Sequence, residues 1–68
     1  MRRTKEEAAK TRAKIVDAAL ECFDRYGIAG STLDQIAAAA GVTKGAIYHH
    51  FASKEELFRA LLEDRIRR

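Results

Sequence analysis

The sequence predicts an all-α fold, with three complete helices and the start of a fourth, connecting helix. Proline is absent and glycine occurs only four times, so residues that favour helix fill most of the chain. Apolar residues recur at three- and four-residue spacing in separate segments, and short stretches of Gly, Ser or Thr divide these segments. A length of 68 residues allows one small domain, covering 1–68.

The first predicted helix runs from an N-cap at Thr4 to Gly27. Thr4 and Glu7 have the spacing of a capping box. One face of this helix is apolar and is expected to be buried: Ile15, Ala18, Ala19, Cys22, Phe23 and Tyr26. Gly27 stands where a left-handed residue commonly ends a helix, and residues 28–30 are predicted to form a short connection.

The second predicted helix opens at Ser31 and Thr32 and ends at Gly41. Thr32 can form a capping box with Gln35. The buried stripe of this helix is Leu33, Ile36, Ala37 and Ala40.

The third predicted helix spans 43–49, with Thr43 as its N-cap, and the fourth opens at Ser53. Ser53 and Glu56 have capping-box spacing. The fourth helix has a core face of Leu57, Ala60 and Leu61 and a second apolar line of Phe58, Leu62 and Ile66. Because this helix has no stop signal and an over-wide apolar face, we expect the chain to be truncated.

The second and third helices have the pattern of a helix-turn-helix over about residues 32–51. Two helices that cross steeply through a tight turn need a small residue at the crossing and a turn residue that tolerates positive φ. Ala37 and Gly41 supply these two residues. The apolar positions that hold the two helices together are Ile36, Ala40, Val42 and Ile47.

The charge distribution is compatible with a polyanionic partner. The formal net charge is only +3, but cations crowd the N-terminus: Arg2, Arg3, Lys5, Lys10, Arg12 and Lys14. No Asp or Glu occurs between Gln35 and Lys54. A surface that faces phosphates needs such a stretch with cations and without acids. The alternative explanation is that the charges cluster there by chance.

The third helix carries groups that suit DNA. With Val42 and Ile47 in the core, the remaining side chains face outward, and none is acidic: Thr43, Lys44, Ala46, Tyr48, His49 and His50. Hydroxyl, ammonium, phenol and imidazole groups contact phosphate oxygens, and lysine reaches guanine O6 or N7. Gly45 lets the backbone approach DNA, and Ala46 can touch a thymine methyl group.

Several of these residues have a second interpretation. Tyr48 is either a DNA contact or a core aromatic residue. One of His49 and His50 can be structural, and a shared metal ion is disfavoured because adjacent helical residues point about 100° apart. A lysine at the start of a helix interacts unfavourably with the helix dipole, and the sequence shows no stabilising contact for Lys54 that offsets this effect. This favours a phosphate contact for Lys54 over a role as part of a charged helix start. The N-terminal cations form either a solvated helix face or an arm that contacts DNA.

Other classes of protein fit less well. The single cysteine, Cys22, cannot form an internal disulfide and indicates a reducing compartment. Cys22 lies among apolar positions, and no general base, oxyanion hole or Gly-rich phosphate-binding loop accompanies it, so we expect that the protein is not an enzyme. We also expect no cofactor and no bound metal ion. A membrane-surface or protein-interaction helix is disfavoured because the apolar face of the first helix is narrow and rich in alanine. No apolar run spans a membrane or forms a signal core, so a cytoplasmic protein is expected.

These residues together resemble the N-terminal signature of the TetR (tetracycline repressor) family of bacterial transcription regulators. The resemblance covers almost the whole chain through Thr11-Arg12, Ile15, Ala18-Ala19, Phe23, Gly27, Thr32-Leu33, Ile36-Ala37, residues 41–48, His50-Phe51 and residues 53–57. Residues 2–8 together with 45–48 are most similar to AcrR-type repressors of multidrug efflux pumps.

The resemblance implies a homeodomain-like domain in which the third helix, residues 43–49, is the recognition helix. It implies a phosphate contact by Thr32, contacts near base edges by Thr43, Lys44, Gly45 and Ala46, and phosphate or groove contacts by Tyr48, His49, His50 and Lys54. His49 departs from the family, which often has an aromatic residue there. The resemblance further implies a ligand-responsive repressor of an efflux, detoxification or metabolic operon, which reads a palindromic DNA operator as a homodimer. The C-terminal domain that would bind the inducer and form the dimer is absent from this sequence.

Overall fold

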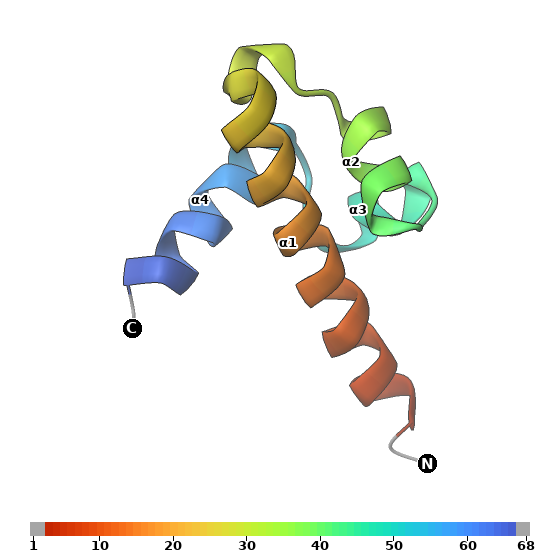
Figure 1. The fold of residues 1–68 in the computed structure, drawn as a ribbon. Coiled ribbons are helices and arrows are strands. Elements are labelled where there is room, and N and C mark those ends of the chain that lie inside the picture. Colours follow the sequence, from red (N-terminus) through yellow and green to blue (C-terminus); the bar gives the residue numbers. More distant parts are fainter. Residues whose placement is uncertain (1–2, 67–68) are drawn as a thin grey trace.

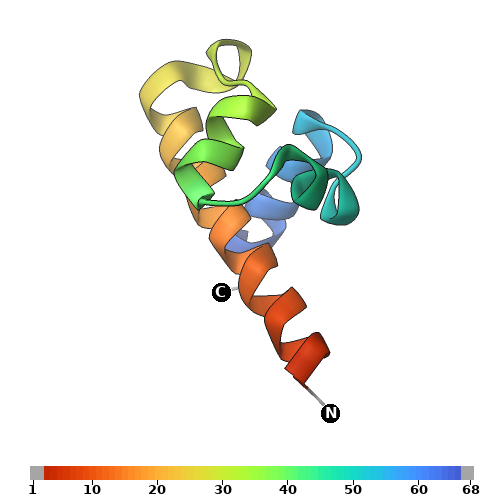
Figure 2. The same cartoon turned by 90° about the vertical axis from the view of Figure 1, so that its right-hand side faces the viewer.

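The computed structural model describes residues 3–66, which form four α-helices. Their bounds are α1 (Arg3–Gly30), α2 (Leu33–Ala40), α3 (Lys44–His50) and α4 (Lys54–Ile66). The long α1 contacts the other three helices, and its N-terminal turns extend beyond them (Figure 1). Turned by 90°, the molecule shows α2 and α3 in front of α1 (Figure 2). The predicted all-α fold is confirmed. Within the described residues, no helix is long and apolar enough to cross a membrane.

The core lies where the apolar faces of the four helices meet. It consists of Ile15, Ala18, Ala19, Cys22, Ile36, Ala37, Ile47, Phe51, Leu57 and Leu61. The predicted face of α1 is confirmed except at Phe23, which is partly buried beside the core, and at Tyr26, which is 50% exposed. Tyr26 lies in the last turn before Gly27, and its ring lines an open groove beside α2 instead of entering the core.

The second apolar line of α4 is partly covered. Phe58 packs edge-on against Phe23, with ring centroids 5.7 Å apart, whereas Leu62 is 41% exposed. The side chain of Ile66 lies outside the described residues. Of the two residues of this line whose side chains are described, Leu62 is therefore the exposed one.

Both ends of α1 differ from the prediction. The helix already includes Arg3, so Thr4 is not its N-cap. Arginine has a high helix propensity, which favours starting the helix before Thr4. Gly27 has the expected positive φ of 78°, but with ψ 167° it kinks the chain, and residues 28–30 add another helical turn. Ser31 is fully buried and donates its hydroxyl proton to the Gly27 carbonyl at 2.7 Å. It therefore closes the end of α1 and does not open α2.

The predicted caps of the next two helices are present. Thr32 and Gln35 exchange two hydrogen bonds of 3.1 Å, which complete the capping box of α2. Thr43 Oγ1 accepts the Ala46 amide proton at 3.1 Å at the start of α3. These bonds fix the start of each helix in the helix-turn-helix.

The cap of α4 closes in a variant form. Ser53 Oγ accepts the Glu56 amide proton at 3.1 Å, as expected. The Glu56 carboxylate, however, accepts the Ala52 amide proton at 2.6 Å. The Glu56 side chain thus closes the box on the amide one residue before the predicted N-cap Ser53.

The turn between α2 and α3 has the predicted geometry. Gly41 is left-handed, with φ 73° and ψ 31°, and its amide donates to the Ala38 carbonyl at 3.2 Å. The Val42 amide donates to the Ala37 carbonyl at 3.0 Å. Ala37 is 5% exposed, whereas Ala39 on the same helix is exposed. The predicted helix-turn-helix register is confirmed.

Ala37→Leu should therefore lower the free energy of unfolding by about 1–3 kcal/mol, because the larger side chain overpacks the crossing of α2 with its neighbours. Ala39→Leu is the matched control and should leave stability almost unchanged. Urea denaturation followed by circular dichroism measures both. Equal midpoints for the two variants would contradict the close packing at Ala37.

Candidate nucleic-acid interface

One buried residue anchors α3, and most of the predicted contact residues lie on its surface. Ile47 is fully buried. The exposed residues are Thr43, Lys44, Gly45, Tyr48 and His49, while Ala46 and His50 are half-buried. Tyr48 is 52% exposed, so its interpretation as a core aromatic residue is wrong. The helix thus offers hydroxyl, ammonium, phenol and imidazole groups on a narrow surface that a major groove can admit.

The capping threonines keep a donor for a partner. Thr32 and Thr43 both use Oγ1 to accept a backbone amide proton, and both remain exposed. A hydroxyl that accepts one hydrogen bond can still donate its own proton, for example to a phosphate oxygen. The N-terminal end of α2 also carries the positive end of a helix dipole, which favours an anion near Thr32.

Lys44 has an acidic neighbour that the sequence pattern did not reveal. Its Nζ lies 3.3 Å from Oδ1 of Asp34 in the first turn of α2. The side chains are 48% and 73% exposed, respectively. The stretch without acids begins at Gln35, directly after Asp34, and the turn at Gly41 returns the chain to that residue. The interpretation of this stretch as an acid-free surface is therefore wrong at this point.

The two histidines lie in different surroundings. Their rings meet edge-on, with centroids 5.2 Å apart. His49 is exposed, whereas His50 is half-buried and its ring lies 6.2 Å from that of Phe51. His50 is therefore the more buried of the two and His49 the more accessible donor, and a packing role of one histidine against the start of α4 stays a prediction.

Lys54 holds the end of α1. Its ammonium donates to the carbonyls of Ile28 at 2.7 Å and Ser31 at 2.9 Å. The Ile28 carbonyl lies in the last turn of α1, where a cation interacts favourably with the helix dipole. The sequence-based interpretation that Lys54 makes no stabilising contact within the fold is therefore wrong. One ammonium proton remains for a phosphate, so that contact stays a prediction.

Lys54→Met is expected to lower the free energy of unfolding by about 1.5–3 kcal/mol, because two carbonyls lose a charged donor while the alkyl stem is kept. Arg59→Met, at an exposed position of the same helix, is the control for loss of charge. Chemical denaturation of the two variants makes the comparison. An equal loss in both would show that the bonds to Ile28 and Ser31 do not stabilise the fold.

One N-terminal cation also has a structural position. The Arg12 guanidinium lies over the Phe51 ring, 5.2 Å from its centroid, and Nη1 is 3.9 Å from Oδ2 of Asp64. Arg12 thus links α1 to the end of α3 and to α4. Lys5, Lys10 and Lys14 are exposed, so a solvated face and a DNA-binding arm both remain open for them. Arg2 and the side chain of Arg3 lie outside the described residues.

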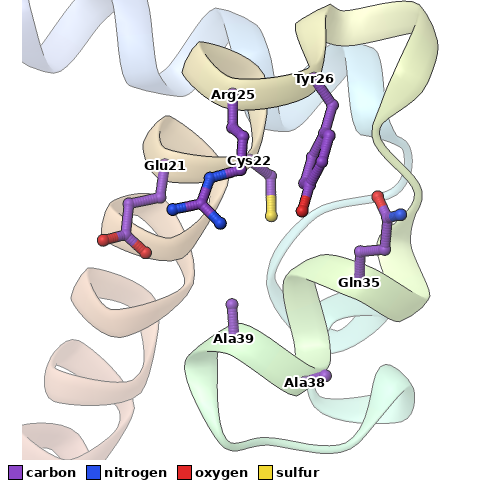
Figure 3. Close-up of a pocket in the computed structure, with 7 residues that line it drawn as sticks. All are labelled: Glu21, Cys22, Arg25, Tyr26, Gln35, Ala38 and Ala39. Carbon is purple, nitrogen blue, oxygen red and sulfur yellow. The ribbon is translucent and has the colours of Figure 1, made fainter.

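A groove between α1 and α2 contains none of the residues predicted to contact DNA. It is lined by Glu21, Cys22, Arg25, Tyr26, Gln35, Ala38 and Ala39 (Figure 3). The Cys22 sulfur points into the space between the two helices (Figure 3). Burial, with a smaller contribution from Glu21, raises the pKa of the Cys22 thiol. The thiol stays protonated near neutral pH and acts as a small apolar core group.

Comparison with known proteins agrees with this geometry. The family model described as "Bacterial regulatory proteins, tetR family" matches residues 15–61. The chain is 57% identical over 63 residues to the HTH-type transcriptional regulator TtgR of Pseudomonas putida, covering 93% of this chain and 30% of that protein. No solved structure matches significantly.

Two further relatives carry similar names. The chain is 50% identical over 62 residues to the HTH-type transcriptional regulator AcrR of Shigella flexneri, covering 91% of this chain and 29% of that protein. It is 52% identical over 62 residues to the HTH-type transcriptional repressor BepR of Brucella suis, and the match covers 91% of this chain and 30% of that protein. The chain thus spans less than a third of the length of these three relatives.

Proposed function

Because the chain belongs to the TetR family of bacterial regulatory proteins and is close to its AcrR-type members, we propose that α3 reads a palindromic DNA operator in the major groove. The proposal includes the role of the chain as the DNA-binding part of a transcription regulator, and it specifies how the chain binds. The observation that carries it is the surface of α3, where polar donors stand exposed around the single buried anchor, Ile47. Such a helix fits the major groove and meets base edges there.

The proposed contacts fall into two groups. Thr43, Lys44, Gly45 and Ala46 lie at the start of α3 and are assigned to base edges or the adjacent backbone. Thr32, Tyr48, His49, His50 and Lys54 are assigned to phosphate or groove contacts. Lys44 is the residue proposed to discriminate between bases, because an ammonium donates to guanine O6 or N7.

Lys44→Ala should reduce the preference for the cognate site over random DNA by roughly 1–3 kcal/mol. Thr32→Ala should weaken both kinds of DNA about equally, because a phosphate contact carries no sequence information. Arg25→Ala, an exposed cation beside the groove of α1 and α2, is the control for net charge. The cognate site is first selected from a pool of random duplexes. Titrations with this site and with shuffled DNA then measure the ratio of the two affinities. If Lys44→Ala weakens all sequences alike, Lys44 does not read bases.

We further propose that the intact protein is a cytoplasmic, ligand-responsive repressor. In this proposal the rest of the protein supplies the dimer interface and the site for a small inducer. The resemblance of residues 2–8 and 45–48 to AcrR-type repressors of multidrug efflux pumps favours an efflux or detoxification operon over a metabolic one. A transporter gene beside this gene would support that choice, and a metabolic operon in the same place would contradict it.

A further inference from the structure

We infer that Asp34 is a specificity-determining residue of the DNA interface, which acts by holding the ammonium of Lys44. The inference rests on the proposed function, because it assumes that Lys44 meets DNA. Asp34 would make binding to random DNA weaker than binding to the cognate site.

The geometry places Asp34 at a fixed point beside the recognition helix. Asp34 lies in the first turn of α2, between the two capping-box residues Thr32 and Gln35, so its backbone is well held. Its Oδ1 lies 3.3 Å from Lys44 Nζ at the start of α3. The pair therefore bridges the two helices of the helix-turn-helix at the end where Lys44 is proposed to approach bases.

Stability alone does not account for this pair. The side chains are 48% and 73% exposed, and an ion pair so open to water contributes little to folding. The same exposure means that a phosphate group can approach both charges. Asp34 then has its main effect on the bound state, where its carboxylate repels phosphate and competes with phosphate for Lys44.

The competition affects the two kinds of DNA differently. Binding to random DNA depends on neutralising phosphates and releasing their counterions, and a lysine already paired with a carboxylate contributes less to this process. At the cognate site, Lys44 is proposed to donate to neutral guanine acceptors. An ammonium has three protons, so Lys44 can donate to guanine and keep its ion pair with Asp34. The cost of the carboxylate falls mainly on random DNA.

The test is Asp34→Asn, which keeps the size of the side chain and removes its charge. At low salt this variant should bind random duplexes roughly three- to tenfold more tightly, with a salt dependence steeper by about one unit, as for one more phosphate contact. Affinity for the selected site should rise less, so the ratio of the two affinities falls. Asp17→Asn, an exposed aspartate on α1, makes the same change in net charge and should preserve the ratio.

A double-mutant comparison separates the pair from general charge effects. In a Lys44→Ala background, Asp34→Asn should change the ratio no more than Asp17→Asn does. An equal fall of the ratio with and without Lys44 would overturn the inference, as would an unchanged ratio in the Asp34→Asn variant. If the unsubstituted chain shows no sequence preference, or if Lys44→Ala leaves its preference intact, the proposed function of Lys44 fails instead. Circular dichroism on each variant verifies that the helices are retained.

Discussion

Ile47→Ala is expected to lower the free energy of unfolding by about 2–5 kcal/mol, which is enough to unfold much of the population. A single core of this size rarely supplies more than about 3–5 kcal/mol in total. Ile47 is fully buried, and it is the one residue of α3 that is buried in the core. Removing three carbon atoms there leaves a cavity between α3 and the helices that support it, and the recognition surface should be lost with the helix.

Tyr48→Ala is the matched control, since it removes a larger side chain from the next position. Tyr48 is 52% exposed, so its loss should change stability by no more than about 0.5 kcal/mol. The same variant should weaken DNA binding if Tyr48 contacts phosphate. Urea denaturation followed by circular dichroism, together with DNA titration, separates the two effects. A wild-type midpoint for Ile47→Ala would show that α3 is held by other contacts.

The sequence predicted those parts of the fold that depend on local spacing. The stripe of α2 and the register of Gly41 follow from residues three or four positions apart, and so do the caps at Thr32 and Thr43. In this stripe Ile36 and Ala37 are buried, and Leu33 and Ala40 are partly buried. Such patterns are visible because one helix face and one turn each need particular residue types at fixed intervals. They also identified α3 as the helix with exposed donors around one apolar anchor, Ile47.

The parts that were missed depend on which helix ends meet in space. Lys54 donates to carbonyls that lie 26 and 23 residues earlier in the chain, and no local pattern indicates this contact. Asp34 approaches Lys44 because α3 folds back beside the start of α2, which the linear count of acids did not show. Tyr26 has the correct spacing for the core face of α1, but its ring lines the open groove beside α2.

The second large effect is expected from joining two copies of the chain. We expect the chain by itself to be mainly monomeric. A stable interface buries about 800 Å² on each partner, which is about one sixth of the total accessible surface of 4900 Å². On α4, Phe58 is already packed against Phe23, and among the side chains of this helix that the structure describes, Leu62, at 41% exposure, is the large apolar one left for self-association.

A monomer contacts only one half-site, so its affinity should stay near the range of sequence-independent binding, about 10⁻⁴–10⁻⁶ M at physiological salt. Two half-sites in successive major grooves lie about 34–36 Å apart. A flexible Gly/Ser linker of about 40 residues has a root-mean-square length near this distance. A tandem of two chains joined in this way should bind a palindromic duplex about 10²–10⁴ times more tightly than the single chain does, because the second contact becomes intramolecular.

Sedimentation of the single chain and titration of both proteins test this expectation. The palindrome is built from the selected half-site, and a duplex with one intact and one shuffled half-site is the control. On that control the tandem should lose most of its advantage, since its second copy finds only random DNA. If the single chain sediments as a stable dimer and binds the palindrome with nanomolar affinity, this domain carries its own dimer interface. The dimer would then not depend on the rest of the intact protein, and the proposed division of roles would be wrong.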